Sequence, residues 1–277
     1  MVTSVGYELF ESVEVEISRA VATVRLLTTE RVAVLSARGS QAELHFDLGR
    51  ALARLREDDA VRVVVITGID DGAPWILPAP PYAEGNSLDP EPIDFPDWMW
   101  KGFQGVRLTQ QTLAEMEKPV VARVNGDCIG FSQSIMFGCD LIVARDDAIV
   151  ADVHMDLQKI FGFDTVPGDG GGALVPLHMF PAKAMEYLLL AKPYTAAELA
   201  NMGAINYAVP PAELDQVVDD MVRQLLSKSA YALALTKRVV KRRVAEQLNL
   251  TLDAASAYEW VNFLHYRGSN GKSNLNL

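Results

Sequence analysis

The sequence predicts an α/β fold, and two observations lead to this prediction. Strand and helix patterns alternate between residues 41 and 180, which is typical of parallel strands joined by right-handed helical crossovers. From Pro181 onward the apolar spacing becomes almost entirely helical. The chain has 277 residues, 49% of them hydrophobic and 22% charged, so it can bury the core of one large domain.

The first elements follow from the spacing of apolar residues. Alternation over Val13–Leu27 predicts a β-hairpin that turns near Ser18–Ala20. Leucines at helical spacing mark an amphipathic helix over Gln41–Leu55. The stretch Val61–Thr67 is almost continuously apolar and β-branched, as expected of a strand that is covered on both faces.

The middle of the chain continues the alternation. Asp97–Glu117 has helical spacing, and this helix should end before Lys118-Pro119 because the residue before a proline disfavours helical geometry. We expect a short helix at Ser132–Phe137. The strands expected in this part are Val120–Val124, Leu141–Ala144 and Ile149–Asp152.

The C-terminal part predicts a separate helical section. One short strand is expected there, at Ile205–Val209. The expected helices are 181–191, 195–203, 211–227, 230–247 and 250–266. We therefore expect an α/β core over residues 1–203 and a helical section over residues 204–277.

Composition excludes several kinds of partner. The net charge of −11 disfavours nucleic acid and anionic membrane surfaces. The N-terminus lacks the basic and apolar regions of a signal peptide, and no apolar run approaches about 18 residues, so a cytoplasmic location is expected. Cys128 and Cys139 are expected to be buried, reduced thiols, and the few Cys and His residues predict no metal site.

Two glycine-containing segments carry a family resemblance. They are KPVVARVNGDCIGFSQSIMFGCDLIVA (118–144) and TVPGDGGGALVPLHMFPAKAMEYLLLA (165–191). Both resemble the signature segments of the crotonase superfamily, the enoyl-CoA hydratase/isomerase group. The resemblance implies a spiral of ββα repeats with a helical C-terminal section, here residues 204–277, that covers the active site and makes trimer contacts. It also implies a homotrimer or dimer of trimers, no cofactor, and backbone N–H groups that stabilise an enolate oxyanion.

The resemblance places one oxyanion donor in the turn after Asn125-Gly126. Gly130 and Phe131 stand there, where the family usually has consecutive glycines. A tight turn that binds no ligand is the structural alternative for this segment.

The other donor should lie in the long segment Gly68–Pro96, which contains seven prolines. The expected position is occupied by Trp75, Ile76, Leu77 and Pro78, of which Pro78 has no N–H to donate. Trp75, Leu77 and Tyr82 offer a large apolar surface instead. We expect these side chains to wall a pocket for a bulky apolar ketone, with packing of the segment itself as the alternative.

The two glutamates of the hydratases are missing from their usual places. Ser134 holds the first position, and the second falls at Gln158–Ile160, which contains no carboxylate. Hydration needs a base that activates water and an acid that protonates carbon. Ordinary enoyl-CoA hydration is therefore not expected.

Other ionisable residues resemble those of the 6-oxocamphor hydrolase-like β-diketone hydrolases, a branch of the superfamily. This resemblance implies that His154 is the general base, oriented by Asp169 in the PGDGG turn. His45 would bind a substrate carbonyl, and Glu259 would protonate the enolate or fix water. The chain departs from this branch in two places, because the dyad histidine normally stands at the position of Ile160 and because Phe131 replaces a substrate-binding histidine.

Structural interpretations stay open for the same residues. His45 could be a satisfied helix histidine, and His154 could lie in a surface loop. Asp169 could cap the helix that follows it. Glu259 could form a surface ion pair with Arg242 or Arg243.

Three functions follow, in order of preference. The first is hydrolytic cleavage of a C–C bond in a β-diketone or cyclic dicarbonyl, by a retro-Claisen route. The second is an enzyme of the hydratase, isomerase or thioester hydrolase type that acts on an acyl-CoA thioester, with Asp169 in place of the glutamates. The third is a catalytically silent paralogue that binds a ligand or a partner subunit.

Overall fold

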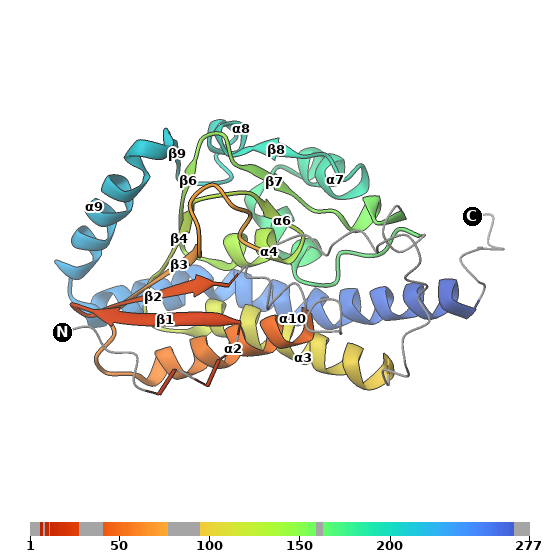
Figure 1. Ribbon diagram of the computed structural model, residues 1–277, viewed down its shortest axis with the longest axis horizontal. Helices are drawn as coiled ribbons and strands as arrows, with labels where there is room; N and C mark the ends of the chain where they lie inside the picture. Colours follow the sequence, from red (N-terminus) through yellow and green to blue (C-terminus); the bar gives the residue numbers. More distant parts are fainter. Residues whose placement is uncertain are drawn as a thin grey trace.

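The computed structural model describes residues 6–7, 9–10, 12–27, 41–76, 95–158 and 163–268 (Figure 1). Its main sheet has the strand order β1-β2-β3-β4-β6-β9. Strands β1 and β2 pair antiparallel, and each later pair in this order is parallel. The strands are β1 (Val13–Ser18), β2 (Val21–Leu26), β3 (Val63–Gly68), β4 (Val120–Val124), β6 (Leu141–Arg145) and β9 (Tyr207–Val209).

A smaller sheet lies beside the main one and leads into the candidate site. It consists of β5 (Cys128–Ile129), β7 (Ile149–Ala151) and β8 (Tyr194–Thr195). Strand β7 pairs parallel with β5 and antiparallel with β8. The sequence did not predict β5 and β8, because a strand of two residues is too short to show a periodicity.

Helices cover these sheets, and the longest runs along the molecule beside α3 (Figure 1). Helices α2 and α3 pack against each other, and α10 contacts both α3 and α6. The helices are α2 (Gln41–Glu57), α3 (Phe95–Glu115), α4 (Phe131–Gly138), α6 (Gly171–His178), α7 (Pro181–Leu189), α8 (Ala196–Asn201), α9 (Leu214–Leu226) and α10 (Ala230–Gly268), with short 3-10 turns η1 (His154–Asp156) and η2 (Pro211–Glu213).

Most predicted elements are present within a few residues of their expected bounds. The N-terminal hairpin is confirmed, and its turn at Arg19 and Ala20 has positive φ angles of 50° and 65°. The two helices predicted over 230–247 and 250–266 are one helix of 39 residues, so that prediction is wrong. Leu248 and Leu252 are both buried at the expected break, and neither Gly nor Pro interrupts the helix there.

The division expected at residue 203 does not separate two cores. Strand β9 lies beyond it and completes the main sheet beside β6. Ala204, Ile205 and Leu248 belong to the same buried cluster as the strands. The helical section therefore folds onto the α/β core and shares its hydrophobic interior.

Helix α10 is fixed to the core by buried charges. Lys237 Nζ lies 2.6 Å from Asp140 Oδ2, and Lys241 Nζ lies 3.3 Å from Asp140 Oδ1. Lys241 also donates to the carbonyl oxygens of Gly138 and Cys139 at the end of α4. A cation at a helix C-terminus is favourable, so these contacts hold α10 where its later turns reach the site. None of the described helices combines the length and apolar character needed to cross a membrane.

Candidate active site

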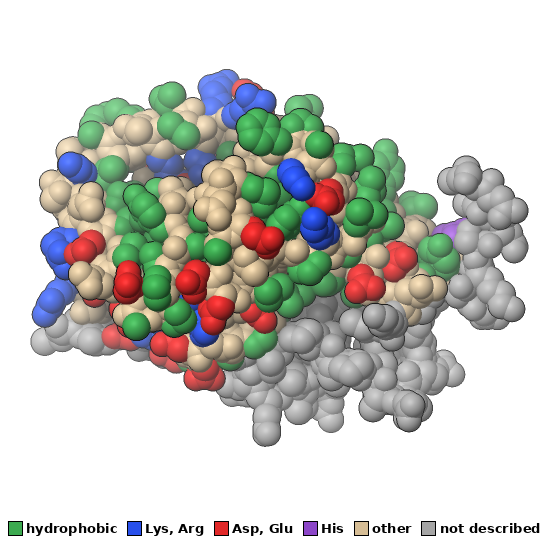
Figure 2. All heavy atoms as spheres, turned by 90° about the horizontal axis from the view of Figure 1, so that it is seen from above, with side chains coloured by type: hydrophobic (Ala, Val, Ile, Leu, Met, Phe, Trp, Pro, Cys, Tyr) green, Lys and Arg blue, Asp and Glu red, His purple; other side chains and the backbone are tan. Residues whose placement is uncertain are grey.

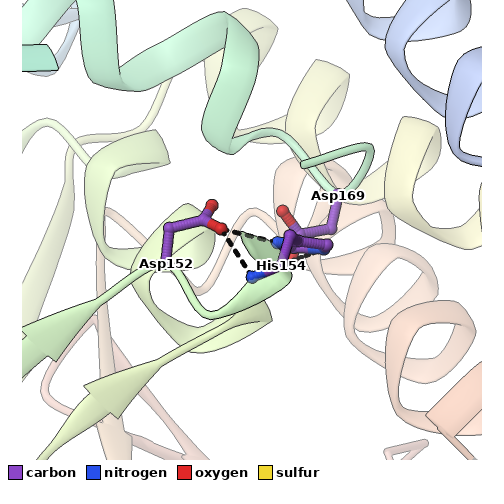
Figure 3. A group of neighbouring side chains, drawn as sticks. All are labelled: Asp152, His154 and Asp169. Carbon is purple, nitrogen blue, oxygen red and sulfur yellow. Dashed lines mark hydrogen bonds and ion pairs between the residues drawn. The ribbon is translucent and has the colours of Figure 1, made fainter. Parts of the chain in front are cut away.

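The turn after strand β7 carries an oriented imidazole. Asp152 follows the strand directly, and its Oδ1 accepts a hydrogen bond from the backbone N–H of His154 at 3.1 Å. The same oxygen lies 2.7 Å from His154 Nδ1 (Figure 3). The Asp152 side chain has no exposed surface, and that of His154 is 9% exposed. The carboxylate therefore fixes the ring orientation in a buried setting.

The other ring nitrogen faces two more carboxylates. His154 Nε2 lies 3.8 Å from Asp169 Oδ2 and 3.7 Å from Glu259 Oε1. Both distances exceed a hydrogen bond. Asp169 stands in the turn before α6, and its side chain points toward His154 (Figure 3), whereas Glu259 comes from α10. A water or substrate atom could lie between His154 Nε2 and either of these carboxylate oxygens.

Glycines in the PGDGG turn make room for these carboxylates. A Cβ added to Gly168 would collide with Glu259 Oε2, and one added to Gly171 would collide with Asp152 Oδ2. Gly170 has a φ of 120°, a conformation that other residues rarely adopt. The glycine run thus brings the backbone of this turn close to two acidic side chains.

Buried polar side chains of α4 donate hydrogen bonds to two of these acids. Ser134 Oγ donates to Asp169 Oδ1 at 2.8 Å, and Gln133 Nε2 donates to Asp152 Oδ2 at 3.3 Å. Tyr187 donates from its hydroxyl to Gln133 Oε1 at 3.4 Å. Sequence reasoning missed Gln133 as a site residue and recorded Ser134 only as a missing glutamate.

Burial and the charges within the cluster shift the pKa values of its own groups. Burial lowers the pKa of His154, but the carboxylates of Asp152, Asp169 and Glu259 more than offset this and hold it well above its usual value. Burial raises the pKa of Glu259 to about 8. Burial also raises the pKa of Asp169, against the opposing effect of the His154 charge. Both shifts favour the protonated forms of His154 and Glu259.

The structure brings together three of the four expected catalytic residues. His154 and Asp169 were expected to approach within hydrogen-bond reach, and their contact is slightly longer, at 3.8 Å. The interpretation that Asp169 orients His154 is wrong, because Asp152 makes the hydrogen bond to Nδ1. The surface interpretations of His154 and Glu259 are also wrong, since both side chains face this buried cluster. His45 belongs to α2, and its side chain lies outside the described residues.

Asp152 could have been found from the sequence. It stands at the end of a predicted strand and two residues before a histidine, and a short acidic side chain there can bond to the backbone two residues later. Gly170 is the N-cap residue of α6, and the Oδ1 atom of Asp169 accepts a hydrogen bond from the N–H of Gly171, the first residue of α6, at 3.3 Å. Asp169 thus supports a helix end and faces His154 at the same time.

The expected oxyanion turn is only partly suited to its role. The N–H of Gly130 donates to the carbonyl of Ala151 at 2.9 Å, so the prediction that Gly130 supplies an oxyanion donor is wrong in this structure. Phe131 is the first residue of α4, and N–H groups at such positions point out of the helix end.

Trp75 does not wall a pocket. Its side chain is fully buried, and its indole N–H donates to Asn125 Oδ1 at 3.0 Å. The same oxygen accepts from the N–H of Gly68, so Asn125 ties the ends of two parallel strands together. The prediction for Trp75 is wrong because this hydrogen bond draws the indole into the core. Leu77 and Tyr82 lie outside the described residues.

The remaining expectations concern cysteine and histidine. Cys128 and Cys139 are buried and free, as predicted. His178 is structural, since its two ring nitrogens contact the carbonyls of Ala204 and Phe137. Asp152, His154 and Asp169 offer possible ligand atoms that all lie within 4.8 Å of one another, and the expectation of no metal site stays a prediction.

A groove of about 710 Å³ opens elsewhere, between α9 and the first strands of the main sheet. Its charged side chains largely satisfy one another, since Arg123 pairs with Asp71 and Asp215 and Arg25 pairs with Glu16. None of the residues of the His154 cluster lines it. We therefore place the candidate chemistry at the buried cluster.

Comparisons with known proteins define the class. A family model described as enoyl-CoA hydratase/isomerase matches residues 98–269. The carnitinyl-CoA dehydratases of Salmonella arizonae and of Escherichia coli K12 are each 30% identical over 203 residues, which cover 72% of this chain and 71% of theirs. This chain therefore belongs to the enoyl-CoA hydratase/isomerase family.

Solved structures agree on the fold. An enoyl-CoA hydratase from Mycobacterium avium subsp. paratuberculosis K-10 has a TM-score of 0.76 at 23% identity, over 94% of this chain and 97% of that chain. A β-diketone hydrolase from Anabaena sp. PCC 7120, bound to (S)-3-oxocyclohexyl acetic acid, has the same TM-score of 0.76 at 20% identity, over 93% and 96%. The expected crotonase fold is confirmed, with ββα elements and a helical C-terminal section whose main element is the long helix α10.

Proposed function

We propose that this protein carries out acid–base chemistry on an acyl-CoA thioester, with Asp169, Glu259 and His154 in place of the two hydratase glutamates. Relatives that are 30% identical are carnitinyl-CoA dehydratases, which supports a thioester substrate more strongly than a diketone. Ser134 and the missing glutamates made ordinary hydration unexpected from the sequence. Two carboxylates that reach the site from the PGDGG turn and from α10 remove that objection.

The expected protonation states of Asp169, Glu259 and His154 suggest a role for each group. Asp169 is the proton acceptor, because the imidazolium next to it opposes the rise that burial causes in its pKa. Glu259, whose pKa is about 8, holds a proton at neutral pH and is the donor. His154 in its charged form stabilises negative charge that develops on the substrate.

Dehydration of a 3-hydroxyacyl-CoA thioester shows how protons are balanced in the proposed reaction. Asp169 removes the proton from the carbon next to the thioester carbonyl, and an enolate forms. Glu259 donates its proton to the hydroxyl on the next carbon, so that the C–O bond breaks and water leaves. One proton is taken and one is given, and the reverse sequence hydrates the double bond.

One observation carries this proposal: His154 Nε2 lies 3.8 Å from Asp169 Oδ2 and 3.7 Å from Glu259 Oε1, so both carboxylates face the same buried ring nitrogen. The test is turnover of 3-hydroxyacyl-CoA thioesters, followed by formation of the enoyl product. Asp169→Asn and Glu259→Gln should each lower kcat by about 10²–10⁴-fold. Glu246→Gln, an exposed position on the same helix, is the matched control.

Retro-Claisen cleavage of a β-diketone is the second candidate, favoured by the oriented imidazole. Neutral His154 would take a proton from water, and the hydroxide would add to one ketone carbon. The C–C bond would then break, and Glu259 would protonate the released enolate. Because this route needs neutral imidazole, its rate should rise as pH passes the raised pKa of His154. The thioester route should instead slow above about pH 8, as Glu259 loses its proton.

The two routes are separated by products. Incubation with 3-hydroxyacyl-CoA and with cyclic β-diketones should give an enoyl thioester in the first case and a keto acid in the second. If neither substrate class turns over and the Asp169→Asn variant binds ligands as the parent does, the silent-paralogue interpretation gains support instead.

Assembly into a homotrimer or a dimer of trimers remains part of the proposal. Figure 2 shows hydrophobic side chains gathered on the face that carries α7 and α8. Phe180, Met185, Leu189 and Leu190 are all exposed there. Patches of this kind mark surfaces that associate. Light scattering after size exclusion should give a mass of three or six chains, and a monomeric mass would contradict this.

A further inference from the structure

The amide of Gln133, a fully buried residue of α4, has hydrogen-bond partners at both of its ends. Its Nε2 lies 2.7 Å from Ser134 Oγ and 3.3 Å from Asp152 Oδ2. At the other end, Oε1 accepts a hydrogen bond from the Tyr187 hydroxyl at 3.4 Å. These partners fix the orientation of the amide, because its nitrogen only donates and its oxygen only accepts.

The orientation of this amide decides where the Ser134 hydroxyl points. An ionised carboxylate can only accept hydrogen bonds, so the NH₂ group of Gln133 faces Asp152. The second amide hydrogen goes to Ser134 Oγ, and the hydroxyl hydrogen must therefore point to another acceptor. That acceptor is Asp169 Oδ1, at 2.8 Å. A serine in a helix can otherwise turn its hydroxyl to a carbonyl of the preceding turn, so the contact with Gln133 favours the hydrogen bond to Asp169.

The two oxygens of the Asp169 carboxylate consequently differ. Oδ1 accepts from Ser134 Oγ at 2.8 Å and from the N–H of Gly171 at 3.3 Å. Oδ2 lies 3.8 Å from His154 Nε2 and, within the part of the chain that the structure describes, accepts no hydrogen bond. The oxygen that faces His154 is thus the one whose lone pairs stay available for a substrate proton.

Gly171 leaves the space that the Gln133 amide needs. A Cβ at this position would collide with Asp152 Oδ2 and would lie 3.0 Å from Gln133 Nε2. It would therefore press on both atoms of the hydrogen bond between these two side chains. The glycine in the PGDGG turn and the glutamine on α4 fit each other.

We propose that Gln133 is a positioning residue, which directs the Ser134 hydroxyl to Asp169 Oδ1 and leaves Oδ2 free to accept the substrate proton. The role of Oδ2 rests on the proposed function, whereas the hydrogen-bond chain does not. Gln133 and Ser134 both have no exposed surface, so they act through Asp169 and not by contact with substrate.

The protonation of Asp169 reports on this chain of hydrogen bonds. Burial raises the pKa of Asp169, the charge of His154 lowers it, and the hydrogen bond from Ser134 also lowers it. Loss of that hydrogen bond should therefore raise the pKa. The titratable groups that face Asp169 come from three parts of the fold: Asp152 and His154 after β7, Glu259 on α10 and Tyr187 on α7.

The test compares Gln133→Met, Ser134→Ala and the double variant in the full chain. Each should raise the pKa of Asp169, measured without substrate by ¹³C NMR of its carboxyl group and assigned with Asp169→Asn. The double variant should titrate as Ser134→Ala alone does, because Gln133 acts through Ser134. With a 3-hydroxyacyl-CoA thioester, Gln133→Met should lower kcat by about 10²-fold at neutral pH and leave KM nearly unchanged. The acidic limb of its kcat profile should move to higher pH.

Gln110→Met is the matched control. Gln110 is another buried glutamine, and its Nε2 lies 3.4 Å from the backbone carbonyl oxygen of Asp169. This variant removes a buried amide beside the same turn but no hydrogen bond to the carboxylate, so the pKa of Asp169 should stay in place. If circular dichroism shows that Gln133→Met does not fold, Gln133→Asn takes its place. Its shorter amide cannot reach Ser134 and Asp152 together, so it should also raise the pKa of Asp169.

The outcomes separate the positioning role from the proposed function. An unchanged pKa of Asp169 in the Gln133 variant, additive shifts in the double variant, or an equal shift in Gln110→Met would overturn the positioning role. If the pKa moves as expected but no acyl-CoA substrate is turned over, the effect of Gln133 on Asp169 stands and the proposed function fails. If the thioester is turned over and the pKa does not move, the proposed function stands and the role of Gln133 fails.

Discussion

The carboxylate of Asp152 contacts His154 twice, at its backbone N–H and at its ring. Oδ1 accepts from the N–H at 3.1 Å and lies 2.7 Å from Nδ1. Because the two residues are separated by one position, this single oxygen shapes the turn after β7 and orients the imidazole. Ring orientation is thus coupled directly to the end of a buried strand.

Replacement of Asp152 by Asn should separate the effect of Asp152 on the orientation of the His154 ring from the effect of its negative charge. The amide can keep the local hydrogen bonds, but the negative charge that raises the pKa of His154 is gone, so this pKa should fall. We expect kcat to drop by about 10²–10⁴-fold and the His154 resonance to titrate at lower pH in NMR. Asp156→Asn, an exposed position in the same turn, is the control and should change neither.

Substitution of Gly171 by Ala should damage the site through the backbone. The new Cβ would collide with Asp152 Oδ2, so either the carboxylate or the turn must move. Overpacking of this kind costs about 1–3 kcal/mol, and the misplaced Asp152 should also lower activity. In the matched variant Gly172→Ala the nearest atom is the carbonyl oxygen of Pro167, at 3.3 Å, so we expect a smaller loss. Denaturant unfolding and turnover measure the two effects, and equal losses in both variants would contradict this explanation.

The raised pKa of Glu259 predicts how stability depends on pH. The folded protein holds this proton up to about pH 8, whereas the unfolded chain releases it near the ordinary value of 4.5. Between these values the folded state binds more protons, so stability falls as pH rises. Chemical denaturation at pH 5 and pH 8 should show a smaller decline for Glu259→Gln than for the parent. An identical decline in both proteins would argue that Glu259 titrates normally.

Removal of the charge of Asp140 should loosen α10. Lys237 and Lys241 are both 8% exposed and share this one carboxylate. Burial already lowers the pKa of Lys237 despite Asp140, so the loss of its partner leaves a costly charge in the interior. Asp140→Asn should destabilise the fold by about 3–5 kcal/mol. Arg242→Gln breaks an exposed pair on the same helix and should cost less than about 0.5 kcal/mol.

The order of elements could be predicted because local patterns decide it. Alternating apolar and polar residues predicted the hairpin of β1 and β2. A continuous apolar run predicted β3, which is buried at every position. The prediction divided the long helix α10 between residues 247 and 250. Burial of Leu248 and Leu252 against the core keeps the helix continuous, and packing of this kind has no local signal.

The candidate site could be predicted only in part. His154, Asp169 and Glu259 were identified by resemblance and do meet in space, although 15 and 90 positions separate them along the chain. Gln133 and Asp152 were missed as site residues. A buried glutamine on an apolar helix looks unremarkable in sequence, because only its partners give it a role.

The sequence by itself determined the α/β class, the two glycine-rich turns and the family, because these depend on local propensity and on motifs. Tertiary structure alone decided which acid orients His154, which residues share its buried surroundings and where Trp75 lies. The distance from His154 Nδ1 to Asp152 Oδ1 is 2.7 Å, a hydrogen bond, whereas the distance from His154 Nε2 to Asp169 Oδ2 is 3.8 Å, which is too long for one. The packing of β7, α6 and α10 sets this difference of about one ångström. The low dielectric of the same interior gives Glu259 its raised pKa, which no isolated segment of the chain would show.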